Sequence, residues 1–156
     1  MQTRLLVLCI ILLSASCKKS NELGTPERVT ANVTTATGSF TIDATNSNVS
    51  VGRFIIPVID IPYVAISGWR NNYEAISLTL PDEIHIGTYN TTLGSAWHAQ
   101  FENTSTGDVF AASDGSGTIT VTSYSGNYIT GTFQFTGYKT NGDSVVVTNG
   151  TFEGDL

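Results

Sequence analysis

The strongest constraint on the fold is a two-residue alternation of apolar and polar side chains, which recurs in short bursts. Successive side chains of a β-strand point to opposite faces, so this period predicts strands with one apolar and one wet face. Abundant Thr and Ser between the apolar positions also favour strands over helices. The alternating apolar residues are Phe40, Ile42, Val64, Ile66, Ile76, Leu78, Leu80, Ile119, Val121, Ile129, Phe133 and Phe135.

Turn-forming residues separate these bursts at intervals of roughly ten residues, a spacing typical of sandwiches and small barrels. We therefore predict an all-β domain over residues 29–156, a single antiparallel β-sandwich or flattened up-and-down, lipocalin-like barrel of roughly eight to ten strands. The predicted turns are Asn46–Asn48, Arg70–Asn72, Pro81–Asp82, Asp114–Gly117, Ser125–Asn127 and Asn141–Asp143.

Residues 1–16 have the pattern of a secretory signal peptide. Arg4 precedes the apolar run Leu5–Leu13, which is too short to span a bilayer as a helix. Small residues ending in Ser16 lie directly before Cys17, and this junction resembles the lipobox of bacterial lipoproteins. The resemblance implies cleavage between Ser16 and Cys17, and lipid attachment, a thioether-linked diacylglycerol with an amide-linked acyl chain such as palmitate, on Cys17.

Residues 17–28 are polar and lack an apolar period, so we expect a lipidated tether between the membrane and the domain. The stretch Lys18–Ser20 resembles the Cys-Lys-Lys starts of Bacteroidetes lipoproteins, which implies an outer-membrane location. Surface export in that group is associated with an acidic cluster directly after the lipidated Cys, and here Lys18 and Lys19 come first. The periplasmic face is therefore favoured over the cell surface.

Charge and reactive residues exclude several classes of function. The whole chain carries −6, and removal of Arg4 with the signal leaves −7, which excludes nucleic acid as a partner. Cys9 leaves with the signal and Cys17 carries lipid, so no free thiol remains for catalysis or zinc. His85 and His98 have neither a nucleophile motif nor metal-ligand spacing beside them. We expect no enzyme, no cofactor and no metal.

The acidic residues Asp108 and Asp114 admit two other interpretations, a carboxylate pair for glycoside cleavage or a calcium loop. Each residue lies next to Gly or Ser, and Asp in such a context commonly caps its own turn. We therefore favour structural turns.

Five aromatic residues of the middle third lie in or near predicted loops and are candidate ligand contacts. Exposed rings of this kind stack on sugars in carbohydrate-binding modules. The competing interpretation, which we favour, is that they fill the edges of the core. The candidates are Tyr63, Trp69, Tyr73, Tyr89 and Trp97.

The segment 54–66 is the most apolar part of the chain after the signal, and it contains Pro57 and Pro62. Proline cannot donate to a strand ladder, so the segment is predicted to be an edge strand, a bulged crossover or an exposed loop. If exposed, it would offer a patch to a partner protein or to the membrane; we favour burial at one end of the core. The residues concerned are Ile55, Ile56, Val58 and Ile59.

Gly131 lies inside an alternating run and occupies an apolar position. A glycine there predicts a bulge, or a bend around a packed aromatic ring.

Three C-terminal stretches, Gly117–Thr122, Ile129–Thr136 and Val147–Phe152, resemble a family of small β-rich Bacteroidetes lipoproteins described only as a domain of unknown function. The resemblance covers about residues 60–156, implies the same fold and location, and brings no catalytic residue. Separately, the triplet around Ser144 resembles the Bacteroidetes O-glycosylation sequon, which implies a glycan on Ser144.

The expected function is a non-enzymatic envelope lipoprotein with a binding or scaffolding role. Its partners are expected to be the lipid bilayer, through acylated Cys17, and a glycan or an envelope protein. One alternative is a glycan-binding module that uses the aromatic residues. Another is a lipocalin-like carrier of a small apolar ligand, although inward Phe, Ile, Leu and Val tend to fill a small barrel.

Overall fold

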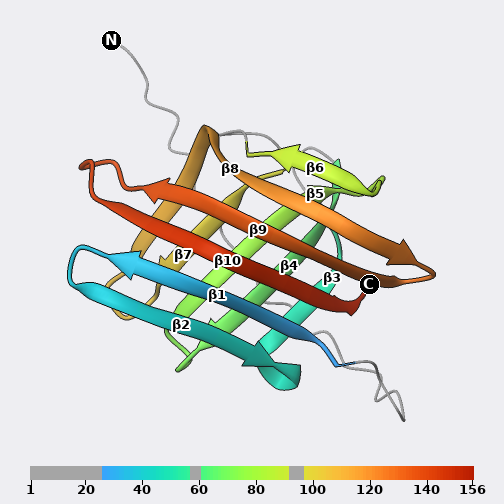
Figure 1. Ribbon diagram of the computed structural model, residues 1–156, viewed down its shortest axis with the longest axis horizontal. Coiled ribbons are helices and arrows are strands. Elements are labelled where there is room, and N and C mark those ends of the chain that lie inside the picture. The colour runs from blue at the N-terminus through green and yellow to red at the C-terminus, as the bar shows by residue number, and fades with distance from the viewer. Residues whose placement is uncertain (1–25, 57–60, 92–96) are drawn as a thin grey trace.

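The computed structural model describes residues 26–56, 61–91 and 97–156 (Figure 1). Ten strands and one short 3₁₀ turn, η1 (Asn46–Asn48), make up the regular structure of this part. None of it is a helix long and apolar enough to cross a membrane. The strands are β1 (Arg28–Thr35), β2 (Gly38–Thr45), β3 (Val49–Ile56), β4 (Ile61–Arg70), β5 (Glu74–Pro81), β6 (Gly87–Asn90), β7 (Ala99–Asn103), β8 (Asp108–Ser125), β9 (Tyr128–Tyr138) and β10 (Ser144–Asp155).

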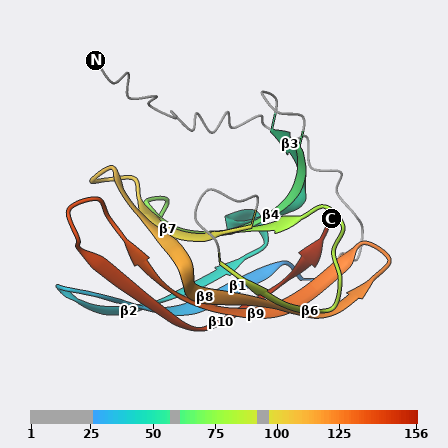
Figure 2. The same cartoon turned by 90° about the horizontal axis from the view of Figure 1, so that it is seen from above.

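All the strands belong to one antiparallel sheet with the order β2-β1-β10-β9-β8-β7-β5-β4-β3, and β6 pairs with a later part of β8, along the same edge as β7. The sheet curls into a nearly closed, flattened barrel, which confirms the predicted fold class. Figure 2 shows its two layers: β2, β1, β10, β9 and the second half of β8 with β6 form the front layer, and β7, β5, β4 and β3 form the back layer.

The 18-residue strand β8 joins the layers because it bends in the middle. Its beginning pairs with β7, the stretch 118–121 pairs with β6, and β9 pairs with β8 on both sides of the bend. The register with β9 shifts between Ala112 and Gly117. The predicted turn at 114–117 was therefore wrong: these small residues absorb a bend within one strand instead of reversing the chain.

The two edges of the sheet approach one another, since β2 packs across β4. Gly68 of β4 makes this approach possible: a Cβ there would lie 2.5 Å from Cβ of Val29 and 3.2 Å from Cβ of Ala44. Any larger residue would push the layers apart.

The apolar residues of all the predicted bursts face the interior. They are buried, except Phe40, which is half-buried against the core. β1 and β10 add further core residues, among them Val29, Val147 and Phe152. The buried polar residues of the described part are Thr79 and Thr91, so its interior is apolar.

The prediction for Gly131 is confirmed. A Cβ at this position would lie 2.2 Å from the carbonyl oxygen of Thr120 and 2.3 Å from Cζ of Phe152. The ring of Phe152 covers the glycine from the paired strand, and the register of β8 shifts between Val121 and Ser123 beside it.

The apolar segment 54–66 differs from the favoured interpretation at Ile55. Ile55 is 59% exposed, so the favoured burial was wrong at this position. The physical reason is that the hairpin of β3 and β4 extends past the end of the core. Pro62 lies inside β4, opposite Ile55, near the start of the strand where proline is tolerated. The side chain of Ile56, together with Val58 and Ile59, lies outside the described residues.

Candidate functional site

The outer face of the front layer carries an array of threonine side chains, which we call the threonine face. The same alternation that buries the apolar residues turns Thr30, Thr130 and Thr151 outward, on three adjacent strands. Such positions repeat about 6.6 Å apart along a strand and about 4.8 Å apart between strands. The members of the face on β6, β8, β9, β10 and β1 are Thr88, Thr118, Thr120, Thr122, Thr130, Thr132, Thr151 and Thr30.

Hydroxyl groups on neighbouring strands of this face hydrogen-bond in pairs. Oγ1 of Thr30 lies 2.7 Å from Oγ1 of Thr151, and the same atoms of Thr122 and Thr130 lie 3.1 Å apart. A hydroxyl both donates and accepts, so each pair keeps acceptor capacity toward solvent. The face therefore presents regularly spaced polar groups held by the sheet.

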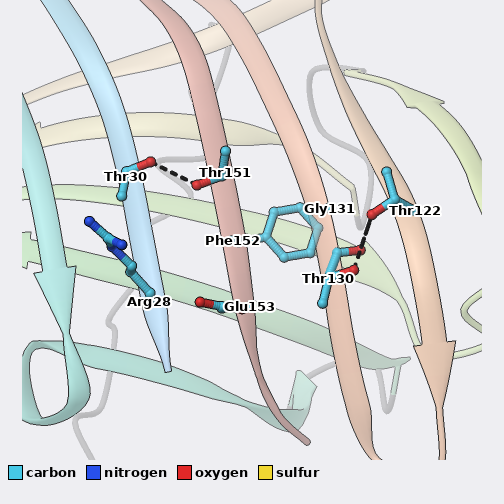
Figure 3. Close-up of a pocket in the computed structure, with 8 residues that line it drawn as sticks. All are labelled: Arg28, Thr30, Thr122, Thr130, Gly131, Thr151, Phe152 and Glu153. Carbon is cyan, nitrogen blue, oxygen red and sulfur yellow. Dashed lines mark hydrogen bonds between the residues drawn. The ribbon is translucent and has the colours of Figure 1, made fainter. Parts of the chain in front are cut away.

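A shallow depression of about 360 Å³ lies on the threonine face (Figure 3). In the figure, the drawn threonine pairs lie on either side of Gly131 and Phe152; a Cβ at Gly131 would point away from the depression, against the buried Phe152 ring. Its lining residues are Arg28, Thr30, Thr122, Thr130, Gly131, Thr151, Phe152 and Glu153.

Charged groups are present at the Arg28 end of the depression. The Arg28 guanidinium donates two hydrogen bonds to Asp43, at 3.0 and 3.1 Å, and this pairing raises its pKa. The Tyr128 hydroxyl donates to Glu153 at 3.0 Å. Burial first, and then the negative charge of Glu153, raise the pKa of Tyr128 to about 12. The depression thus offers one paired cation, one carboxylate and several hydroxyl groups.

This set of groups suits hydrogen bonding to a polar ligand. The lining residues include no His, Cys or Lys, and their one carboxylate, Glu153, accepts a hydrogen bond from the Tyr128 hydroxyl. Across the described part of the chain, no three His, Asp or Glu side chains cluster as metal ligands.

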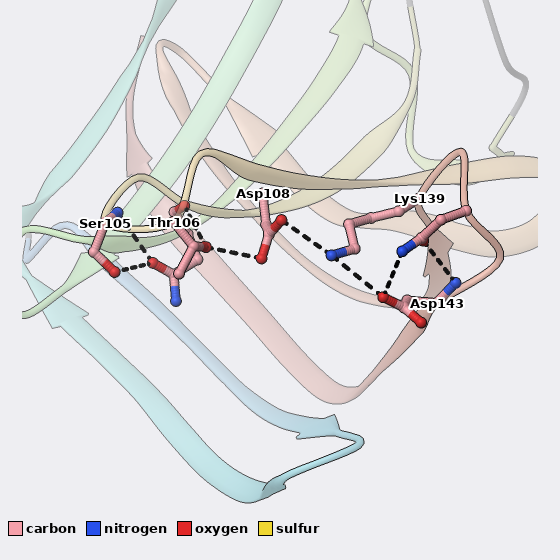
Figure 4. A network of polar contacts seen from close by, with 7 residues as sticks. Ser105, Thr106, Asp108, Lys139 and Asp143 are labelled. Carbon is pink, nitrogen blue, oxygen red and sulfur yellow. Dashed lines mark hydrogen bonds and ion pairs between the residues drawn. The ribbon is translucent and has the colours of Figure 1, made fainter.

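A second polar cluster lies at the opposite end of β9, around Lys139 (Figure 4). Its ammonium donates to Asp108 at 3.0 Å, lies 3.4 Å from Asp143, and sits 5.0 Å from the ring centroid of Phe110. Hydrogen bonds from Lys139 and then Thr106 lower the pKa of Asp108. A lysine therefore neutralises the carboxylate considered for a glycosidase pair or a calcium loop; the side chain of Asp114 is outside the description.

The five aromatic candidates do not meet in one place. Tyr63 and Trp69 share the outer face of β4 but are six residues, or about 20 Å, apart. Tyr73, 56% exposed, lies in the turn after β4, and Trp97, 38% exposed, lies before β7. Tyr89 packs against the core, and its hydroxyl bonds the backbone of His85.

The remaining predicted positions lie elsewhere. Ser144 is exposed at the start of β10, beside the Asp143 carboxylate that Lys139 and Asn141 hold. Cys17 and Ser16 lie outside the described residues.

The sequence analysis did not identify the threonine face as a site. Its threonines were predicted only as solvent-facing positions of separate strands. Strand register brings Thr122 beside Thr130 across the β8–β9 hairpin, and it brings Thr30 beside Thr151 although these two are 121 residues apart in sequence. The repeated Thr-x-Thr spacing at 118–122 and 130–132 was the signal that could have indicated a patterned face.

These features define a small all-β domain with an apolar interior and a polar, hydroxyl-rich outer face. The family described as Domain of unknown function (DUF6252) matches residues 58–154, and the chain belongs to this family. The match begins ahead of β4, so β1 and β2, which extend the sheet beyond β10, precede it. Comparison with curated proteins gave no match. Comparison with solved structures gave none either.

Proposed function

We propose that this protein is a non-enzymatic, lipid-anchored domain of the bacterial cell envelope that binds a glycan on its threonine face. Cys17 carries the lipid, residues 18–25 form the tether, and the periplasmic face of the outer membrane is the proposed location. The protein would hold a hydroxyl-rich polymer near the membrane, in a binding or scaffolding role.

The observation that carries the proposal is the depression on the threonine face. A sheet that covers an apolar core needs polar residues on its solvent-facing side, but it does not need rows of paired hydroxyl groups around a depression. Such groups match the alternating donors and acceptors of a sugar chain. A lipocalin-like carrier is less well supported, because large side chains such as Phe133, Phe135 and Phe152 occupy the described interior.

Binding is tested by titrating the mature protein with a panel of envelope glycans and following backbone amide shifts by NMR. We expect saturable shifts at Thr30, Thr130 and Thr151. The variant Thr130→Arg fills the depression and is expected to weaken binding at least tenfold, roughly the loss of one well-placed contact. Thr140→Arg, at an exposed turn position away from the depression, is the matched control.

Two outcomes contradict the ligand assignment. If no glycan of the panel binds, or if Thr130→Arg and Thr140→Arg bind equally well, the threonine face is not the site. If saturable shifts gather around Trp69 or Trp97, the aromatic residues of the back layer carry the binding instead.

The anchor and the location have their own test. Metabolic labelling with palmitate should mark the wild type and leave Cys17→Ala unlabelled. Protease added to intact cells should spare the protein, and protease added to lysed cells should digest it. Digestion on intact cells would place the domain on the cell surface.

A further inference from the structure

Large apolar side chains are exposed together near the end of the β3–β4 hairpin. Phe54 is 37% exposed, Ile55 59% and Ile61 41%. Tyr63 stacks on Phe54 from the paired strand, with ring centroids 5.8 Å apart. We call these four residues the hairpin patch. Single exposed apolar residues are common on proteins, but a contiguous group on two paired strands marks an interaction surface.

The hairpin patch covers both sides of a two-stranded ribbon. Phe54 and Tyr63 face each other in the register and project outward, whereas Ile55 projects from the opposite side. Figure 2 shows β3 rising away from the rest of the sheet. A flat protein partner would cover one side and leave the other in water. Hydrocarbon surrounds an inserted ribbon and covers both sides.

The base of the hairpin is fixed to the barrel by polar contacts. The Arg53 guanidinium is bonded to the Asp82 side chain and, at 3.1 Å, to its carbonyl oxygen. It also donates to the Tyr124 hydroxyl at 2.8 Å. The patch is therefore held in place at a polar boundary, with apolar residues beyond it.

The tether leaves the domain at the same end as the hairpin patch. The hydroxyl oxygen of Tyr128 lies 3.4 Å from the carbonyl oxygen of Pro26. Tyr128 pairs with Ser125 of β8, next to Tyr124, which accepts from Arg53. Cys17 precedes Pro26 by nine residues, and such a segment reaches at most about 30 Å. The anchor and the patch therefore face the same membrane.

We propose that the hairpin patch inserts into the lipid bilayer that holds acylated Cys17, and so gives the domain a second point of attachment. This inference rests on the lipid anchor of the proposed function. One flexible tether leaves a domain free to rotate, whereas two attachments at one end fix its orientation to the membrane.

The test uses the lipidated protein reconstituted into phosphatidylethanolamine–phosphatidylglycerol vesicles. The Cys17 thiol is blocked by its lipid, so Ile55→Cys supplies the one free thiol for an environment-sensitive fluorophore. Val146→Cys is the matched control, because Val146 is 41% exposed and lies on β10 at the other end of the barrel. Lipids that carry a quencher should lower the fluorescence at position 55 about twofold or more and leave position 146 unchanged.

Three outcomes overturn the proposal. If vesicle flotation and the acyl mass on Cys17 are intact but position 55 is unquenched, the anchor stands and the patch is not in lipid. If the fluorescence responds to protein concentration and not to quencher lipids, a second copy covers the patch. If the protein neither carries acyl mass nor floats, the proposed anchor fails, and this inference fails with it.

Discussion

At the scale of single residues, two glycines allow two aromatic rings to pack closely against the neighbouring strands of the front layer. Gly131 lies under Phe152, and Gly150 lies under Phe133; a Cβ at Gly150 would come within 2.5 Å of the Phe133 ring. The two rings stack with centroids 6.5 Å apart. The glycines are therefore needed for space and not for turns, and their exchange should disturb the core.

Gly131→Ala should destabilise the protein by about 1–3 kcal/mol, because the added methyl overlaps both Thr120 and Phe152. The change is measured as the free energy of unfolding in urea. Thr132→Ala, one residue further along β9 and exposed, is the control and should stay within about 0.5 kcal/mol. Equal free energies of unfolding for the two variants would show that the core accommodates the added methyl group without losing stability.

The Tyr128 hydroxyl makes the free energy of unfolding depend on pH in the alkaline range. Burial and Glu153 raise its pKa to about 12, so the neutral phenol is favoured in the folded state. The stability gained is complete below the ordinary pKa of about 10 and is lost as pH rises through about 12. Tyrosinate absorbance of the wild type and Tyr128→Phe should differ by one late-titrating group, and Glu153→Gln should shift that group to lower pH.

If that late-titrating group persists in Tyr128→Phe, another tyrosine is responsible. If Glu153→Gln leaves the pKa of Tyr128 unchanged, burial and the charge of Asp155 set the value without Glu153.

At the scale of elements, β3 is an edge strand attached to the barrel mainly through β4 and the Arg53 contacts. Edge strands expose one row of backbone groups and open more easily than central ones. The position of β3 therefore depends on side chains at its base.

Arg53→Met should loosen this hairpin while the rest of the barrel keeps its structure. Amide hydrogens of β3 and the start of β4 should exchange faster, since the contacts to Asp82 and Tyr124 are gone. Exchange in β9 and β10 should stay unchanged. Arg28→Met, which removes the ion pair with Asp43 on the other edge of the sheet, is the control and should leave β3 as it is. Uniform acceleration in both variants would contradict a local role for Arg53.

Sequence periodicity was sufficient to predict the fold class, because the alternation within a strand depends only on residues that are neighbours in sequence. Ile76, Leu78 and Leu80 are buried as the pattern predicts, since alternation directly determines which face is apolar. The stretch Asp114–Gly117 could not be assigned correctly, because glycine permits a turn and a bulge equally well. Pairing with β9 decides for the bulge, and pairing is not a local property.

The candidate site was hidden for the same reason. Thr30 and Thr151 become neighbours only through the β1–β10 pairing, which the local pattern does not specify. Exposure of Ile55 was likewise beyond prediction, since it depends on where the core ends relative to the hairpin. Aromatic residues, which are visible in sequence, drew attention to positions that the fold keeps apart.

At the scale of the whole molecule, β10 lies between β1 and β9, so strands from opposite ends of the described chain are paired in the middle of one layer. Arg28 lies opposite Glu153, and Val29 opposite Phe152. The first and last strands in chain order are thus paired at the centre of the front layer.

A chain that lacks residues 144–156 should fail to fold. Loss of β10 exposes β1 and β9 and removes the buried residues Val145, Val147 and Phe152. We expect no cooperative unfolding transition by circular dichroism. A chain that lacks residues 18–25 should unfold like the mature protein, because none of the described strands begins before Arg28. A native-like transition without β10 would show that β1 and β9 close the sheet by themselves.

The central position of β10 also affects the order in which the strands can pair during folding. The front layer cannot assemble around β1 and β9 until the last 12-residue strand has emerged. Pairings of such long sequence separation form slowly. Until residues 144–155 are available, β1 and β9 therefore lack the strand that lies between them. The front layer is complete only when β10 has paired with both β1 and β9.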